Sequence, residues 1–187
     1  MIIGVTGTIG AGKGEVAEYL VRKKGFKRYS ARDTITEEIV RRGLPVNRDT
    51  MTATANDMRR IVGPSYPQPQ MFAKAEAEGA QDAVFESVRE IAGGEFLKAH
   101  GGYIFAVDAQ PRLRYERAVK RKSATDDVDY DTFLAHEQRE MHSTDPAKQN
   151  IAGVMAMADV VLTNNGTLEE FHQQIDAALA RLRQAQH

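Results

Sequence analysis

Short apolar runs alternate along this chain with longer segments in which apolar residues recur every three or four positions. Runs of the first kind are typical of buried strands, and segments of the second kind are typical of helices with one apolar face. Five runs predict strands, at residues 2–6, 27–30, 83–87, 103–107 and 159–162. Helices are predicted over about 15–24, 34–42, 47–62, 111–122, 130–141 and 146–158, and from 167 onward.

The order of these elements predicts the fold class. Strands that alternate with helices form a parallel sheet, because each helix carries the chain back to begin the next strand in the same direction. We therefore expect an α/β protein with a five-stranded parallel sheet and helices on both faces. The sequence has no internal repeat, low-complexity tract or break in composition, and its 187 residues suit one domain. Residues 1–187 are accordingly predicted to form a single domain.

Composition and charge exclude several classes of protein. The formal net charge of -1 argues against binding nucleic acid through a general positive field. The sequence contains no cysteine, which excludes disulfides and thiolate metal sites. No apolar run is long enough to span a bilayer, and no basic segment of a signal peptide precedes the first apolar run. We therefore expect a cytoplasmic protein with no membrane or nucleic-acid partner.

The segment from Gly7 to Gly14 reads Gly-Thr-Ile-Gly-Ala-Gly-Lys-Gly and fits the pattern G-x-x-x-x-G-K. It follows a predicted strand and opens a predicted helix, as the motif requires. Glycines let backbone N–H groups converge on phosphate oxygens, and the helix N-terminus adds its positive dipole end. Lys13 is then expected to reach the β- and γ-phosphates of ATP; the alternative is a tight turn without a ligand. The predicted nucleotide-binding residues of this loop are Gly7, Thr8, Gly10, Ala11, Gly12, Lys13, Gly14 and Glu15.

The position after Lys13 departs from the general motif, in which a Ser or Thr hydroxyl binds Mg²⁺. Gly14 stands there, and Glu15 follows it. Two interpretations stay open for Glu15. It holds Mg²⁺ directly or through water, or it is an acid that is favourable in the first turn of a helix. The loop thus predicts nucleotide binding and leaves the reaction open.

Asp33 follows the second predicted strand, in the sequence Ser-Ala-Arg-Asp. The carboxyl ends of parallel strands line the ligand crevice in this kind of fold, so Asp33 is expected to face a phosphoryl acceptor. There it would orient or deprotonate an acceptor hydroxyl. The alternative is that Asp33 is the N-cap of the helix predicted to begin near Thr34, because Asp is a favoured cap.

Arginines supply the positive charge that phosphoryl transfer requires. Arg114, Arg117 and Arg121 recur at i, i+3 and i+7 and share one face of a predicted helix. This spacing predicts a clamp on the ATP phosphates, with a solvated surface paired to acids as the alternative. The candidates for binding the acceptor's phosphate, with surface salt bridges as their alternative, are Arg59, Arg60 and Arg89.

Asp108 ends the apolar run at 104–107. In form it is similar to the acid that holds magnesium in P-loop NTPases, but it comes late in the chain. The alternative is that Asp108 shapes the loop leading into the helix that Pro111 opens.

Taken in order, these segments resemble the dephospho-CoA-kinase-like and adenylate-kinase-related members of the P-loop nucleoside monophosphate kinase superfamily. The resemblance spans nearly the whole chain. It implies a three-layer α/β/α P-loop kinase fold with an acceptor-binding subregion over about residues 34–80 and a helical lid over about 112–145. The segments that carry it are GTIGAGKGE at 7–15, SARD at 30–33, NDMRR at 56–60, ESVR at 86–89, VDA at 107–109, RYER at 114–117, ADVVL at 158–162 and NNGTL at 164–168.

The resemblance also implies roles for single residues. It places the ATP phosphates at the glycine loop, adenine near Asn164 to Gly166, and the acceptor near Asp33, Arg59 and Arg89. Dephospho-CoA kinases usually have Ser or Thr after the loop lysine, and this chain departs from them there. The residues expected to be catalytic are Lys13, Asp33, Arg117 and Arg121.

We therefore expect a kinase that uses ATP and Mg²⁺ to phosphorylate a small, phosphate-bearing acceptor, in the first instance a nucleoside or deoxynucleoside monophosphate. Dephospho-CoA is the alternative acceptor. A different class also stays open, a nucleotide-binding regulatory module or slow ATPase, because Gly14 and Glu15 replace the usual hydroxyl.

Overall fold

The computed structural model of the protein describes residues 1–120, 128–146 and 148–185. Its centre is a sheet of parallel strands in the order β2-β3-β1-β4-β5. Strand β1 lies in the middle, with Val5 opposite Glu86 of β3 and opposite Phe105 of β4. The predicted five-stranded parallel sheet is confirmed. The strands are β1 (Ile2–Gly7), β2 (Lys27–Ser30), β3 (Ala83–Glu86), β4 (Tyr103–Asp108) and β5 (Val160–Thr163).

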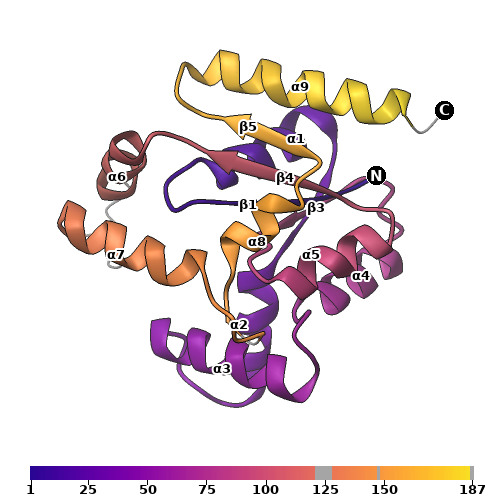
Figure 1. Ribbon diagram of the computed structural model, residues 1–187. Coiled ribbons are helices and arrows are strands. Elements are labelled where there is room, and N and C mark those ends of the chain that lie inside the picture. The colour runs from indigo at the N-terminus through magenta and orange to yellow at the C-terminus, as the bar shows by residue number, and fades with distance from the viewer. Residues whose placement is uncertain (121–127, 147, 186–187) are drawn as a thin grey trace.

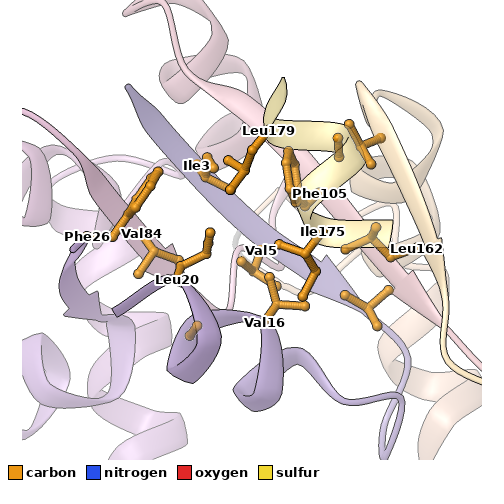
Figure 2. Close-up of a cluster of buried hydrophobic side chains, with 14 of the residues drawn as sticks. Ile3, Val5, Val16, Leu20, Phe26, Val84, Phe105, Leu162, Ile175 and Leu179 are labelled. Carbon is orange, nitrogen blue, oxygen red and sulfur yellow. The ribbon is translucent and has the colours of Figure 1, made fainter. Parts of the chain in front are cut away.

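Helices cover both faces of the sheet, which gives the three layers of a P-loop kinase fold (Figure 1). Helices α1 (Lys13–Lys24) and α9 (Leu168–Gln184) pack on one face. Figure 2 shows part of this core, in which Ile3 and Val5 of β1 lie among side chains of α1 and α9. The opposite face packs against α4 (Gln68–Ala77), α5 (Ile91–Ala99) and α8 (Ile151–Ala156).

The remaining helices surround the end of the sheet to which the strands point. Helices α2 (Ala31–Arg41) and α3 (Arg48–Ile61) share a small core of their own. Helices α6 (Pro111–Lys120) and α7 (Tyr130–Met141) follow β4, and Tyr115 of α6 meets Tyr130 and Phe133 of α7 edge to face. The acceptor subregion and lid predicted for about 34–80 and 112–145 stay predictions.

Helices α4 and α5 are not predicted by the sequence pattern. Gly93 and Gly94 lower the helix propensity of α5 and interrupt its apolar periodicity. Packing explains Gly93, because a Cβ there would stand only 2.7 Å from the side chain of Gln68. Helix α8 is shorter than the predicted 146–158, since Asn150 caps it with a 2.8 Å hydrogen bond from the Gly153 N–H.

The boundaries beside the site differ from the prediction in two places. Strand β3 ends at Glu86 rather than at residue 87, because Ser87 turns the chain with a φ of 67°. Such left-handed backbone is costly for a residue with a Cβ and is often found at functional sites. Helix α2 begins at Ala31, three residues before the predicted start. Within the described ranges, no helix has the length and apolar character needed to cross a membrane.

Candidate functional site

The glycine loop joins β1 to α1 at the end of the central strand. Gly10 and Gly12 have φ values of 76° and 109°, a conformation that residues with side chains rarely adopt. Space is also restricted. A Cβ on Gly10 would collide with the carbonyl oxygen of Arg114, and one on Gly12 would meet the amide nitrogen of Asn164. The loop glycines therefore let two distant segments, residues 114 and 164, approach its backbone closely.

Lys13 is the first residue of α1, and its side chain folds back over the loop. Its ammonium donates hydrogen bonds to the carbonyls of Gly7 and Thr8, at 2.9 and 2.7 Å. The positive charge thus lies above the loop, beside the N-terminus of α1. A helix N-terminus and an ammonium group together make a site suited to phosphate.

The segment predicted to hold adenine is tied directly to the glycine loop. The buried amide of Asn164 donates to the carbonyl of Ala11 at 2.8 Å, and Arg117 donates to the carbonyl of Asn164 at 2.9 Å. Two residues that the sequence predicts separately, Arg117 and Asn164, therefore lie together. Gly166 lies two residues beyond Asn164, before α9. Arg121 lies outside the described residues.

Arg114 is not available as a phosphate clamp. It is only 4% exposed, and its guanidinium donates to the carbonyls of Ala109 (2.7 Å) and Ile9 (3.3 Å). Two further contacts join it to Glu137 of α7, one of them 3.0 Å long. Arg114 therefore holds α7 against the glycine loop, although it shares a helix with Arg117.

Asp108 also serves the loop. Its carboxylate accepts a hydrogen bond from the Thr8 hydroxyl at 2.7 Å and from the N–H of Ala109 at 2.9 Å. These contacts connect the end of β4 to the loop and favour the structural alternative for Asp108 over a magnesium role.

Glu15 points toward α9. Its carboxylate lies 2.7 Å from Nε2 of His172, whose ring stacks on Tyr19 with the centroids 4.1 Å apart. The acid that faces residue 14 is Glu86 instead. One of its carboxylate oxygens lies 3.8 Å from the point where a Cβ of Gly14 would stand. Glu86 also pairs with Arg28 at 2.5 Å.

Glu86 is a candidate that the sequence reasoning misses as a site residue. The signal is present, since the apolar run at 83–85 ends in this acid. Its meaning depends on the sheet order, which places β3 next to β1 and so brings Glu86 to the start of α1. Within the described residues, no group of three or more His, Asp or Glu side chains forms a ready metal site.

Asp33 lies in the first turn of α2, and its backbone N–H donates to the Ser30 hydroxyl at 3.3 Å. Ser30 is therefore the N-cap, and the alternative interpretation of Asp33 as the cap of this helix is wrong. The exposed Asp33 lines a small cavity of about 90 Å³ with Arg28 and Lys74. Such a volume is too small for a nucleotide-sized ligand.

Arg59 and Arg89 occupy different environments. Arg59 is buried and pairs with the buried Glu90. Burial raises the pKa of the Glu90 carboxyl, while the charges of Arg59 and Arg89 act to lower it. Arg89 is 33% exposed and donates to Glu140 and Gln149 at 3.2 Å each. Arg60 is exposed at the end of α3.

A larger cleft lies where α3 and α7 approach each other. Its volume is about 430 Å³, within the range of small-molecule sites. Two of its lining residues, Glu140 and Gln149, are the partners of Arg89. The structure thus places Arg89 against two residues of the cleft wall, whereas Arg59 is buried against Glu90, the residue after Arg89. The lining residues are Thr52, His136, Arg139, Glu140 and Gln149.

Comparison with known proteins agrees with this architecture. A family model described as AAA domain matches residues 3–145. The UPF0200 protein TK1334 of Thermococcus kodakarensis is 30% identical over 183 residues, which are 94% of each chain. A shikimate kinase from Bacteroides thetaiotaomicron superposes with a TM-score of 0.58 at 15% identity, covering 99% of this chain and 97% of that one. A dephospho-CoA kinase from Campylobacter jejuni gives 0.54 at 14% identity, covering 100% and 98%.

Proposed function

Because this chain belongs to the UPF0200 family and to the AAA-domain family and has a P-loop kinase fold, we propose that it transfers the γ-phosphoryl group of ATP to a small anionic acceptor. The nucleoside and deoxynucleoside monophosphates are the first class of acceptor. The observation that carries the proposal is the glycine loop, where the Lys13 ammonium and the N-terminus of α1 lie together at the end of β1.

The loop favours nucleotide binding on physical grounds. ATP phosphates at the N-terminus of α1 would attract the Lys13 ammonium away from the carbonyls of Gly7 and Thr8, because a phosphate carries full negative charge and a carbonyl does not. Asn164 would then fix the loop while the segment up to Gly166 borders the base. Arg117, held at the carbonyl of Asn164, is near enough to this segment to share in charge stabilisation.

The residues around position 14 fit a hydrated magnesium ion. Gly14 leaves open the space that a side chain would fill, and the Glu86 carboxylate faces that space. Carboxylate and water oxygens are the ligands that Mg²⁺ prefers. Glu86, rather than Glu15, is therefore the residue proposed to hold the ion. When bound, Mg²⁺ would neutralise charge on the phosphates and orient them for transfer.

On the acceptor side, Arg89 is proposed to bind the acceptor's anionic group. Arg59 supports it from the core, through Glu90, the residue next to Arg89. Asp33 is proposed to orient the acceptor, although it lines a different and smaller cavity. A phosphate acceptor is already ionised and needs no general base, whereas the ribose hydroxyl of dephospho-CoA does. Asp33→Asn should therefore damage the two reactions unequally.

One observation favours a second candidate, a nucleotide-dependent regulatory module with slow ATP turnover. In the usual motif a Ser or Thr hydroxyl after the lysine binds Mg²⁺. Here Gly14 has no side chain and the carboxylate of Glu15 is paired with His172, so neither takes that role. This candidate predicts tight nucleotide binding and turnover that no acceptor stimulates.

The deciding experiment is ADP production from Mg-ATP with a panel of acceptors: the common ribo- and deoxyribonucleoside monophosphates, dephospho-CoA, and no acceptor. We expect one acceptor class to stimulate turnover and Lys13→Ala to abolish the stimulation. ATP binding with the same turnover across the whole panel would exclude the kinase and favour the regulatory module.

A further inference from the structure

Helix α7 places a carboxylate on the arginine proposed to bind the acceptor. Glu140, in the last turn of α7, accepts a hydrogen bond from Nη1 of Arg89 at 3.2 Å. The side-chain oxygen of Gln149 accepts from the same nitrogen, also at 3.2 Å. A carboxylate and a phosphate present similar oxygens to a guanidinium. Glu140 therefore stands where the anionic group of a ligand would stand.

The geometry of this pair is that of a replaceable contact. Both bonds leave from one nitrogen and are longer than the 2.7–2.9 Å that is usual for charge-assisted hydrogen bonds. The side chains of Arg89 and Glu140 are 33% and 26% exposed, so water competes with the contact between them. An arginine offers five N–H donors in a planar fork, and a phosphate can accept from two of them at once. A phosphate ligand can thus offer Arg89 a better partner than Glu140 does.

Arg89 itself is held in place independently of Glu140. Its carbonyl accepts a 2.9 Å hydrogen bond from the N–H of Asn150, which caps α8. The residue also directly follows the turn at Ser87 and Val88, and Val88 is fully buried. The backbone of Arg89 is therefore fixed by the fold, and only its side-chain partners are exchangeable. Loss of Glu140 should leave the arginine where it is.

The cleft provides the room for such an exchange. Glu140 and Gln149 form part of its wall, and His136 and Arg139 lie on the same helix and line it too. With about 430 Å³ available, an anionic ligand of metabolite size can enter without rearrangement of the core.

From these contacts we propose that Glu140 is an internal competitor for the acceptor's anionic group, which displaces it from Arg89 on binding. The inference rests on the proposed acceptor site and adds a residue that sets its affinity. It requires the acceptor to carry a phosphate-like group, because an uncharged acceptor would gain nothing by displacing a carboxylate. Glu140 acts through Arg89 and is a positioning residue.

The test is a titration of the ¹⁵N-labelled protein with inorganic phosphate, followed by NMR at the Nε–H resonance of Arg89, which Arg89→Lys identifies by removing it. Glu140→Gln should tighten phosphate binding at this resonance about twofold to fivefold, the range in which exposed ion pairs contribute. Asp131→Asn is the matched control. It removes one negative charge from the exposed first turn of the same helix and should leave the affinity unchanged.

Phosphate can also bind the glycine loop, so the titrations are repeated with Lys13→Ala in each variant, where the effect of Glu140→Gln should persist. Unchanged or weaker binding in Glu140→Gln would overturn the inference, as would equal tightening in Asp131→Asn. The titration uses neither ATP nor turnover. If no acceptor stimulates turnover in the kinase assay, the proposed function fails, but a tighter phosphate affinity of Glu140→Gln would still support the competition at Arg89. If Glu140→Gln does not bind phosphate more tightly, the competition at Arg89 fails, but acceptor-stimulated turnover would still support the kinase.

Discussion

Helix α7 carries two carboxylates three residues apart, and each pairs with a different arginine. Glu137 pairs with Arg114, which is 4% exposed and also reaches the glycine loop through the carbonyl of Ile9. Glu140 lines the cleft of about 430 Å³ and pairs with Arg89, which is 33% exposed. Figure 1 shows α7 near α6 on one side and α3 on the other.

The difference lies in what each pair leaves behind when it breaks. Arg114 would be left as a buried charge without its carboxylate, at a cost that keeps this pair closed. Arg89 would meet water or a ligand, so its pair can open at little cost. The pair beside the glycine loop is thus a permanent contact, whereas the pair at the cleft can exchange its partners. The proposed function would use the first arrangement to hold the nucleotide and the second to admit and release the acceptor.

Replacing each arginine in turn tests whether the two ion pairs contribute differently to stability. Arg114→Ala leaves the carboxylate of Glu137 without its guanidinium partner and should lower the free energy of unfolding by about 3–5 kcal/mol. Arg89→Ala should lower it by less than about 1 kcal/mol, because its pair is exposed to solvent. Urea denaturation of both variants gives the two values. Equal losses would mean that the two ion pairs do not differ in the way described.

The second prediction concerns the glycine loop alone. Lys13→Ala should reduce turnover of Mg-ATP by about 10²–10³-fold, the usual loss when one group that stabilises developing charge is removed. The ammonium donates hydrogen bonds to the carbonyls of Gly7 and Thr8, and circular dichroism of the variant checks that the fold is retained. Lys23→Ala, an exposed lysine of the same helix, is the control for charge and should retain full activity. Similar losses in both variants would refute the role of Lys13.

These two predictions differ in how far the sequence alone could support them. The glycine loop is a contiguous segment between a strand and a helix, so local pattern suffices to predict its place in the fold. Arg114 looks identical to Arg117 in the sequence, since both lie on one face of a charged helix. Their difference arises from Glu137, which is distant in the chain. Only the packing of α7 against α6 reveals that one arginine is buried and structural.

The fold shows the same limit. Short runs along the chain predict the five strands, and the signal is strongest in β1, β3 and β4, whose residues are mostly buried. It does not predict α5, where Gly93 is required by the side chain of Gln68 from another helix. Glu86 is likewise recognised only after the sheet order places β3 beside β1. Contacts between distant segments determined each of these features.

The third prediction tests which acid beside the glycine loop holds the proposed Mg²⁺ ion. Glu86→Gln should lower Mg²⁺-supported turnover by about 10–100-fold, the range found for groups that position a metal. Glu15→Gln should cost no more than a few fold, because its carboxylate is engaged by His172. Turnover is measured as a function of Mg²⁺ concentration. This distinguishes an increase in the Mg²⁺ concentration needed for half-maximal turnover from a decrease in the maximal rate. A greater loss in Glu15→Gln would return the metal role to that residue.

The smallest expected effect lies at the C-terminal end of α2, where Glu38 pairs with Arg41 and with Arg42, which also contacts Asp57 of α3. Hydrogen bonds from the two arginines lower the pKa of Glu38 to about 2 from its ordinary value of 4.5. A lowered pKa in the folded state means that the stabilisation is present above pH 4.5 and is lost as the pH falls toward 2. Acid should therefore weaken the ion pairs that Glu38 makes at the C-terminal end of α2.

Urea denaturation of wild type and Glu38→Gln at several pH values measures this contribution. The difference in free energy of unfolding should be about 1 kcal/mol or less at neutral pH, because solvent screens the pair, and should shrink toward zero as the pH approaches 2. Glu37→Gln, which alters a more exposed carboxylate on the same helix, should show a smaller difference. A difference for Glu38→Gln that stays constant with pH would mean that the carboxylate stabilises α2 through packing rather than charge.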